Sequence, residues 1–183
     1  MKQFKQLMLA VCAIAALTVT AQQPDPVLNA ITQNYQLTKE SLKKNKALGN
    51  EMVTKFTYTV LGQGKTTETL HFFYETVRGT YLLASDEDKH FNYYPLRFVT
   101  RSYNIGKKKY YEEFLYDKNQ QLIFALYKGY NNLGKPAEQR FYLEDGSFYK
   151  TIGENITPRI EDVFYQAEEL RRAFDLLARN PKE

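Results

Sequence analysis

Apolar positions recur every three or four residues near the start of the region that follows residue 24. The stripe consists of Leu28, Ile31, Tyr35, Thr38 and Leu42. This spacing is typical of an amphipathic α-helix, because it brings the side chains onto one helix face. Asp25 before Pro26 favours a helix start, as a cap followed by a first-turn proline. We therefore predict a helix over about residues 26–47.

A second helical stripe lies near the end of the chain. Its apolar face consists of Ile160, Val163, Phe164, Ala167, Leu170, Phe174 and Leu177, and charged residues occupy most of the opposite side. Thr157 and Pro158 supply a cap and a first-turn proline, and Asn180 with Pro181 ends the pattern. The predicted helix covers about residues 158–178.

Between these helices the hydrophobic period changes to two, the repeat of a β-strand. The pattern predicts about eight strands, at residues 51–60, 66–76, 80–84, 96–105, 109–116, 121–128, 138–143 and 147–152. Most connections are short polar turns, which favour antiparallel pairing because a parallel pair needs a long crossover. The expected fold class is α+β: an antiparallel meander, as a curved sheet or a partly open barrel, flanked by an N-terminal and a C-terminal helix.

The strand at residues 121–128 is apolar on both faces. Leu122, Phe124 and Leu126 are expected on one face, and Ile123, Ala125 and Tyr127 on the other. A sheet with one wet side alternates apolar and polar residues, so some central strands are predicted to be covered twice. One cover is a helix; the other is either a tyrosine-lined curved sheet or a second small core under loops. The ligand-contact residues that we predict are His71, Phe73, Tyr111, Tyr127 and Tyr142.

The first residues have the features of a bacterial secretory signal peptide. Lys2 and Lys5 form a basic start, an apolar run covers residues 7–17, and small or β-branched residues lead to Ala21. We expect residues 1–21 to be removed, which leaves one α+β domain over residues 22–183, without a stable membrane span, in the periplasm or outside the cell. An uncleaved anchor helix is the alternative.

Composition narrows the classes of function. Cys12 is the only cysteine and lies in the predicted signal peptide, so the mature chain is expected to have neither a disulfide nor a thiol nucleophile. Loss of Lys2 and Lys5 lowers the formal net charge of +4 by two, and the one basic run, residues 107–109, falls at a predicted turn. A nucleic-acid surface needs a broader basic stripe, so no nucleic-acid partner is expected. With 15 Tyr, 12 Phe and no Trp, the aromatic residues favour strands and tyrosine-mediated contacts.

Few side chains are arranged for metal binding. His71 and His90 are the only histidines, and the acidic residues 86–88 lack the glycine and the later glutamate of a calcium loop. We interpret the acidic run as a solvated turn, and we expect no metal site and no cofactor.

Candidate catalytic groups are sparse as well. Glu112 and Glu113 are adjacent on a strand, so they are predicted to point to opposite faces and not to act as a glycosidase pair. Surface positions or cross-strand ion pairs with Arg97, Arg101 or Arg140 are the expected role of both. A hydrolase that uses His71, Glu112, Glu113 and Asp117 is kept as one alternative function.

Two segments in the second half of the chain share an aromatic run, an acidic residue, a polar turn and a second aromatic run. They are "EEFLYDKNQQLIFALYK", residues 112–128, and "EQRFYLEDGSFYKTI", residues 138–152. Their patterns, FxYDxxxxLIF and ExRFYxxDGxxxK, together with a signal peptide ending in "TAQQ", resemble those of exported, uncharacterised proteins of Bacteroidetes-type bacteria. The resemblance implies export and hairpin geometry, and no activity or catalytic residue comes with it.

The function expected from these features is that of an exported, non-catalytic binding or interaction domain. Its partner is a protein or a small-molecule ligand. The first alternative is an envelope carrier that holds an apolar ligand in the curved sheet. The second is the hydrolase named above.

Overall fold

The computed structural model describes residues 25–43, 49–62, 64–82, 88–156 and 158–178. The predicted signal peptide, the end of the first predicted helix after residue 43 and the predicted cap Thr157 lie outside these residues. In chain order the elements are α1 (Pro26–Lys43), β1 (Asn50–Val60), β2 (Gly64–Tyr74), β3 (Val77–Leu82), β4 (Asp88–Tyr93), β5 (Leu96–Ile105), β6 (Lys108–Tyr116), β7 (Leu122–Tyr130), β8 (Pro136–Glu144), β9 (Ser147–Gly153) and α2 (Ile160–Ala178).

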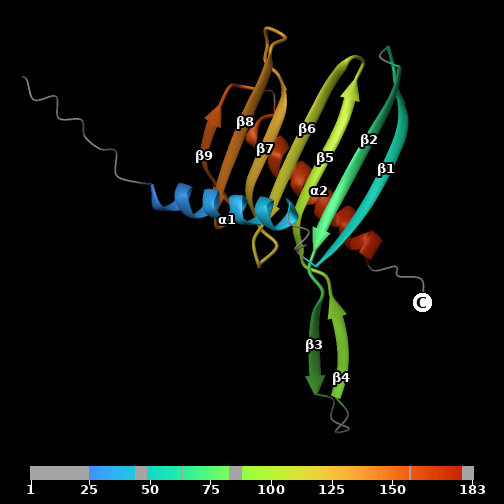
Figure 1. Cartoon of the computed structure of the whole chain (residues 1–183), viewed down its shortest axis with the longest axis vertical. Helices are drawn as coiled ribbons and strands as arrows, with labels where there is room; N and C mark the ends of the chain where they lie inside the picture. Colours follow the sequence, from blue (N-terminus) through green and yellow to red (C-terminus); the bar gives the residue numbers. More distant parts are fainter. Residues whose placement is uncertain (1–24, 44–48, 63, 83–87, 157, 179–183) are drawn as a thin grey trace, which may run out of the picture.

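Seven strands form one antiparallel sheet in the order β1-β2-β5-β6-β7-β8-β9. The two helices lie on opposite faces of this sheet (Figure 1). The α+β meander flanked by two helices is therefore confirmed. The outer strands β1 and β9 do not pair, so the sheet is open and not closed into a barrel.

The strands β3 and β4 form a separate hairpin that extends away from the sheet (Figure 1). The sequence pattern predicts one strand here, at residues 80–84, followed by an acidic turn. This prediction is wrong for Asp88, which begins β4, while residues 86 and 87 lie outside the described part. β4, with the sequence DKHFNY, escaped prediction because its apolar alternation consists of only two residues, Phe91 and Tyr93. Its strand conformation comes from main-chain pairing with β3, from Val77 opposite Tyr93 to Leu82 opposite Asp88.

The helix α1 covers one face of the sheet with its predicted stripe. Ile31 and Thr38 are buried, and Leu28, Tyr35 and Leu42 are partly buried. The sheet residues beneath them are Phe98, Leu115, Phe124, Leu126 and Tyr142. The predicted cap is also confirmed, because the Asp25 carboxylate accepts a hydrogen bond from the Leu28 N–H at 3.0 Å.

The helix α2 covers the opposite face and packs on the larger core. Val163, Ala167, Leu170 and Phe174 are buried there. The core residues of the sheet are Leu70, Phe72, Leu96, Val99, Phe114, Tyr116, Leu122, Ala125, Tyr127, Phe141 and Leu143. Aliphatic and aromatic side chains together form this contact, so the stabilisation comes mainly from buried apolar area.

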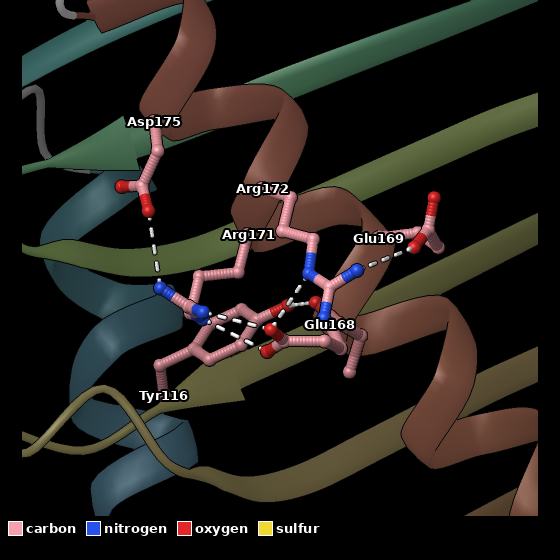
Figure 2. A network of polar contacts seen from close by, with 7 residues as sticks. Tyr116, Glu168, Glu169, Arg171, Arg172 and Asp175 are labelled. Atoms are coloured by element: carbon pink, nitrogen blue, oxygen red, sulfur yellow. Dashed lines mark hydrogen bonds and ion pairs between the residues drawn. The ribbon is translucent and has the colours of Figure 1, made fainter.

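A polar contact fixes α2 on the sheet (Figure 2). The buried Tyr116 hydroxyl donates a hydrogen bond to the Ala167 carbonyl oxygen at 2.8 Å. Next to it, Arg171 binds Glu168 at 2.8 Å and Asp175 at 3.0 Å, one turn on either side. The ion pairs are partly exposed and contribute little, whereas the buried hydroxyl has to find a partner. Tyr116 therefore sets where α2 lies along the strands.

A bulge in β7 decides which face its side chains reach. Tyr116 pairs with Leu122, but Leu115 pairs with Phe124, so Ile123 is the extra residue. Leu122 packs on the α2 face, whereas Phe124 and Leu126 pack on the α1 face. The prediction that these three residues share one face is wrong, because the bulge shifts the alternation by one residue. Coverage of β7 on both faces is confirmed, and both covers are helices.

We predict that a central strand and an edge strand differ in how they tolerate loss of a phenylalanine. Phe114→Ala removes a ring that is 0% exposed and should lower the free energy of unfolding by about 3–5 kcal/mol. Phe56→Ala, the matched control on the edge strand β1, removes a ring that is 47% exposed and should cost less than about 1 kcal/mol. Urea denaturation measures both values. Equal losses would contradict this assignment of the core.

Candidate functional site

The turn between β5 and β6 determines which residues meet on the α2 face of the sheet. Gly106 adopts a φ of 59°, in the left-handed region that a tight hairpin turn requires. This turn sets the register, in which Tyr103 lies opposite Tyr110 and Arg101 lies opposite Glu112. Four polar or aromatic side chains thus gather at one end of the sheet.

Glu112 is the buried centre of this group, with 3% of its side chain exposed. Its carboxylate accepts a hydrogen bond from the Tyr103 hydroxyl at 2.8 Å and a longer one from the Arg101 Nη1 at 3.3 Å. Arg101 also donates to Glu68 at 2.7 Å, and Glu68 accepts from the Tyr58 hydroxyl at 3.1 Å. We call Glu68, Arg101, Tyr103 and Glu112 the Glu112 cluster. It places two carboxylates around one guanidinium.

Tyrosine rings stack outward from the Glu112 cluster. The Arg101 guanidinium lies 4.8 Å from the centre of the Tyr103 ring, a cation–π distance. The Tyr103 and Tyr110 rings are stacked, with centroids 5.1 Å apart and planes at 8°. Tyr110 meets Tyr130 edge to face, with centroids 5.7 Å apart. The series gives the site rigid aromatic walls.

Gly129 allows this stack to lie close to the sheet. A Cβ atom at this position would lie 2.9 Å from the Tyr110 ring, closer than van der Waals contact permits. The missing side chain therefore lets Tyr110 lie directly on the β7 backbone. Any larger residue would displace the ring.

A cavity of about 290 Å³ lies between this aromatic cluster and the start of α2. We call it the tyrosine cavity, and its lining residues are Tyr103, Ile105, Tyr110, Glu112, Tyr127, Lys128, Tyr130, Ile156, Pro158 and Gln166. The Tyr127 hydroxyl donates to the Gln166 side-chain oxygen at 2.7 Å, which ties the wall to α2. The cavity is near the lower end of the volumes usual for small-molecule sites.

The strands β6 and β7 separate at the same end of the sheet. Their pairing stops at Tyr111 and Lys128, although the strands continue to Lys108 and Tyr130. In place of a main-chain partner, the Lys109 N–H donates to the Tyr130 hydroxyl at 3.4 Å. An open groove of about 760 Å³ shares Tyr110, Lys128 and Tyr130 with the tyrosine cavity, and so adjoins it.

Burial raises the pKa of Glu112 above its ordinary value of 4.5. Arg101 and the Tyr103 hydroxyl act in the opposite direction, because they stabilise the charged form. Their effect is smaller than that of burial, since Arg101 is shared with Glu68. Glu112 is therefore an incompletely compensated carboxylate on the wall of a cavity, a combination that is common at functional sites.

Glu113 is buried on the opposite face of the sheet, with 2% of its side chain exposed. Its carboxylate accepts hydrogen bonds from the Tyr35 hydroxyl at 2.5 Å and from the Tyr111 hydroxyl at 2.6 Å, and it forms an ion pair with Lys39. Burial, together with the neighbouring carboxylate, raises the pKa of both tyrosines. Three donors satisfy Glu113, and they come from α1 and β6. This cluster holds α1 on the sheet.

The predicted ligand-contact residues lie on both faces of the sheet. Tyr127 lines the tyrosine cavity on the α2 face. Tyr142 is buried under α1, and Tyr111 binds Glu113 on that side. Phe73 stacks on His71, whose ring nitrogen lies 2.6 Å from Glu51 near the sheet edge. The structure therefore brings Tyr127 alone of the five to the candidate site.

The groups considered for hydrolysis do not converge. Glu112 and Glu113 point to opposite faces, as predicted, but both are buried and neither is a surface residue. Asp117 accepts hydrogen bonds from the Asn119 and Gln121 N–H groups in a turn. His71 is bound to Glu51. These four side chains therefore lie at separate places in the structure and do not form one site.

Sequence reasoning missed Tyr103, Tyr110, Tyr130 and Gln166. The turn at Gly106 carries a usable signal, because a two-residue hairpin loop fixes the register and so pairs Tyr103 with Tyr110. Gln166 lies on a helix distant in the sequence, and no local pattern indicates its contact with Tyr127.

Within the residues that the structure describes, no group of three or more His, Asp or Glu side chains is placed to hold a metal ion. No described helix combines the length and the apolar character needed to cross a membrane. No protein-family model, curated protein or solved structure matches the chain. The functional conclusion therefore comes from the geometry of the site.

We predict that Glu112→Gln changes how stability depends on pH. Since the pKa of Glu112 is raised on folding, this carboxyl stays protonated to a higher pH in the folded chain than in the unfolded chain. Its contribution therefore lowers the free energy of unfolding as the pH rises above 4.5. The free energy of unfolding of Glu112→Gln minus that of the wild type should become more positive as the pH rises from about 4.5 to 7. Urea titrations at several pH values measure it.

Glu138→Gln is the control, because its effect on the pH dependence of the free energy of unfolding should have the opposite sign. Burial raises the pKa of Glu138, but hydrogen bonds from Lys128 and Arg140 outweigh it, so the pKa is lowered. This carboxylate stabilises the fold above its ordinary pKa, and the stability is lost as the pH falls through the lowered value. The free energy of unfolding of Glu138→Gln minus that of the wild type should therefore become more negative as the pH rises towards 4.5. Equal slopes for both variants would contradict the assignment.

Proposed function

We propose that this chain is an exported binding domain that takes a small ligand into the tyrosine cavity. The observation that carries the proposal is the placement of Glu112, an incompletely compensated buried carboxylate, in a cavity with rigid aromatic walls. A binding site of this kind combines apolar area with a few polar groups that orient the ligand. Tyrosine supplies both, because its ring is rigid and its hydroxyl is polar.

The geometry favours binding over catalysis. The polar groups that meet at the cavity are a carboxylate, its arginine partner and tyrosine hydroxyls, and burial raises the pKa of Tyr103 and Tyr127 further above neutrality. These hydroxyls therefore remain protonated and act as hydrogen-bond donors or acceptors. Glu112 also argues against the alternative function, a carrier of a wholly apolar ligand. Such a ligand would desolvate the carboxylate without offering it a hydrogen-bond donor.

Export is part of the proposal and rests on the N-terminal pattern that ends at Ala21. When the full chain is expressed in a bacterial host, mass spectrometry of the periplasmic fraction should find a mature protein that begins at Gln22. Ala21→Tyr should leave the precursor uncleaved, because signal peptidase requires a small residue there. Thr20→Tyr, at the position between the two recognised residues, should be processed normally. A periplasmic protein that retains residues 1–21 would contradict cleavage.

We predict that filling the tyrosine cavity abolishes binding. A panel of sugars, nucleosides, amino acids, aromatic acids and amines is titrated against the wild-type chain with ¹³C-labelled tyrosine rings. At least one class should shift the resonances of Tyr103, Tyr110 and Tyr127 at saturation. Ile105→Trp places an indole in the cavity and should weaken that binding at least about tenfold, or about 1.4 kcal/mol.

Leu61→Trp is the matched control, because Leu61 is 99% exposed in the turn between β1 and β2. It should bind as the wild type does. The chain has no tryptophan, so each variant carries a single indole, whose emission on selective excitation reports whether it is buried. If no panel compound shifts the cavity tyrosines, or if Ile105→Trp binds unchanged, the tyrosine cavity is not the ligand site.

A further inference from the structure

The charge on the wall of the tyrosine cavity restricts what can bind there. Glu68 and Glu112 share the one guanidinium of Arg101, so the Glu112 cluster has a formal charge of −1. Lys128, which lines the cavity, is bound to Glu138 at 3.1 Å. A negatively charged ligand would therefore meet a buried carboxylate of like charge.

Glu112 also has unused acceptor capacity. A carboxylate offers about four lone-pair sites, and Glu112 receives one hydrogen bond from Tyr103 and one long hydrogen bond from Arg101. Glu113 provides the comparison, because an equally buried carboxylate on the other face has three donors. Glu112 lines the tyrosine cavity, so a ligand bound there can supply a further donor.

The cavity walls suit a cation as well. Arg101 lies over the Tyr103 ring at 4.8 Å, and Lys108 lies over the Tyr130 ring at 5.0 Å. Both contacts place a positive group of the chain against a tyrosine ring of this cluster, the geometry of a cation–π interaction. Tyr127 presents a third ring on the cavity wall, and its hydroxyl is held by Gln166.

We propose that the tyrosine cavity binds a small organic cation, whose ammonium or guanidinium group donates to Glu112 and whose apolar or aromatic body lies against the tyrosine rings. The inference rests on the proposed function and names the ligand class of the same site. A charge-assisted hydrogen bond to a buried carboxylate is roughly twice as strong as a neutral one, and this favours the cation over a neutral alcohol of the same shape.

Three probes that share a phenyl ring and differ in charge test whether the cavity prefers a cation. Benzylamine is a cation at neutral pH, benzyl alcohol is neutral and benzoate is an anion. In titrations that follow the ring resonances of Tyr103, Tyr110 and Tyr127, benzylamine should bind at least about tenfold more tightly than benzyl alcohol, and benzoate should not bind. Benzyl alcohol or benzoate binding as tightly as benzylamine overturns the cation while leaving the cavity as a ligand site. If neither these probes nor the wider panel binds, the proposed function fails too.

Glu112→Gln tests the carboxylate directly. It keeps the shape of the side chain and should weaken benzylamine binding at least about tenfold, with little effect on benzyl alcohol. Glu51→Gln is the matched control at the far edge of the sheet, and should bind as the wild type does. Unchanged benzylamine binding to Glu112→Gln overturns the proposal.

A measurement on the wild type keeps the proposal testable if Glu112→Gln does not fold. Since the folded pKa of Glu112 is raised, binding of a cation to its charged form should release protons, and the affinity for benzylamine should rise with pH above 4.5. The other titratable groups that face Glu112 are Arg101 and Tyr103 from β5, Glu68 from β2 and Tyr127 from β7. Calorimetry in buffers of different ionisation enthalpy counts the protons. Proton uptake, or an affinity that falls with rising pH, overturns the proposal.

Discussion

The structure depends on the burial of two adjacent carboxylates on the central strand β6. Glu112 and Glu113 point to opposite faces, and each face is covered by a helix or by aromatic side chains. A buried charge is costly unless it is paired and hydrogen-bonded, so partners must be supplied on both sides. On one side they come from Arg101 and Tyr103 of the neighbouring strand. On the other they come largely from α1, through Tyr35 and Lys39.

The two carboxylates differ in how completely their hydrogen-bonding capacity is satisfied. Glu113 has three donors and joins α1 to the sheet, which suits a structural role. Glu112 shares its arginine with Glu68 and lies on the wall of a cavity. Removal of one partner of a buried pair is strongly destabilising, so both positions constrain the fold. The incomplete pairing of Glu112 is the observation on which the proposed ligand contact rests.

The aromatic residues divide between packing and the site. Rings such as Phe72, Phe98 and Phe114 are wholly buried and fill the two cores. Tyr103, Tyr110 and Tyr130 gather instead at the end of the sheet where β6 and β7 separate, and all three line the cavity. Of the five residues predicted to contact a ligand, Tyr127 reaches this place because the bulge in β7 decides its face.

The sequence by itself determined both helices, the antiparallel meander and the divergence of Glu112 and Glu113, because periodicity and alternation are local properties. It also placed the turn at Gly106, which pairs Tyr103 with Tyr110. It missed β4, because the apolar alternation there is limited to Phe91 and Tyr93 and its partner strand β3 was predicted only in part. Only the tertiary structure decided the bulge at Ile123, the burial of both carboxylates and the cavity roofed by Gln166, because these depend on contacts between residues far apart in the chain.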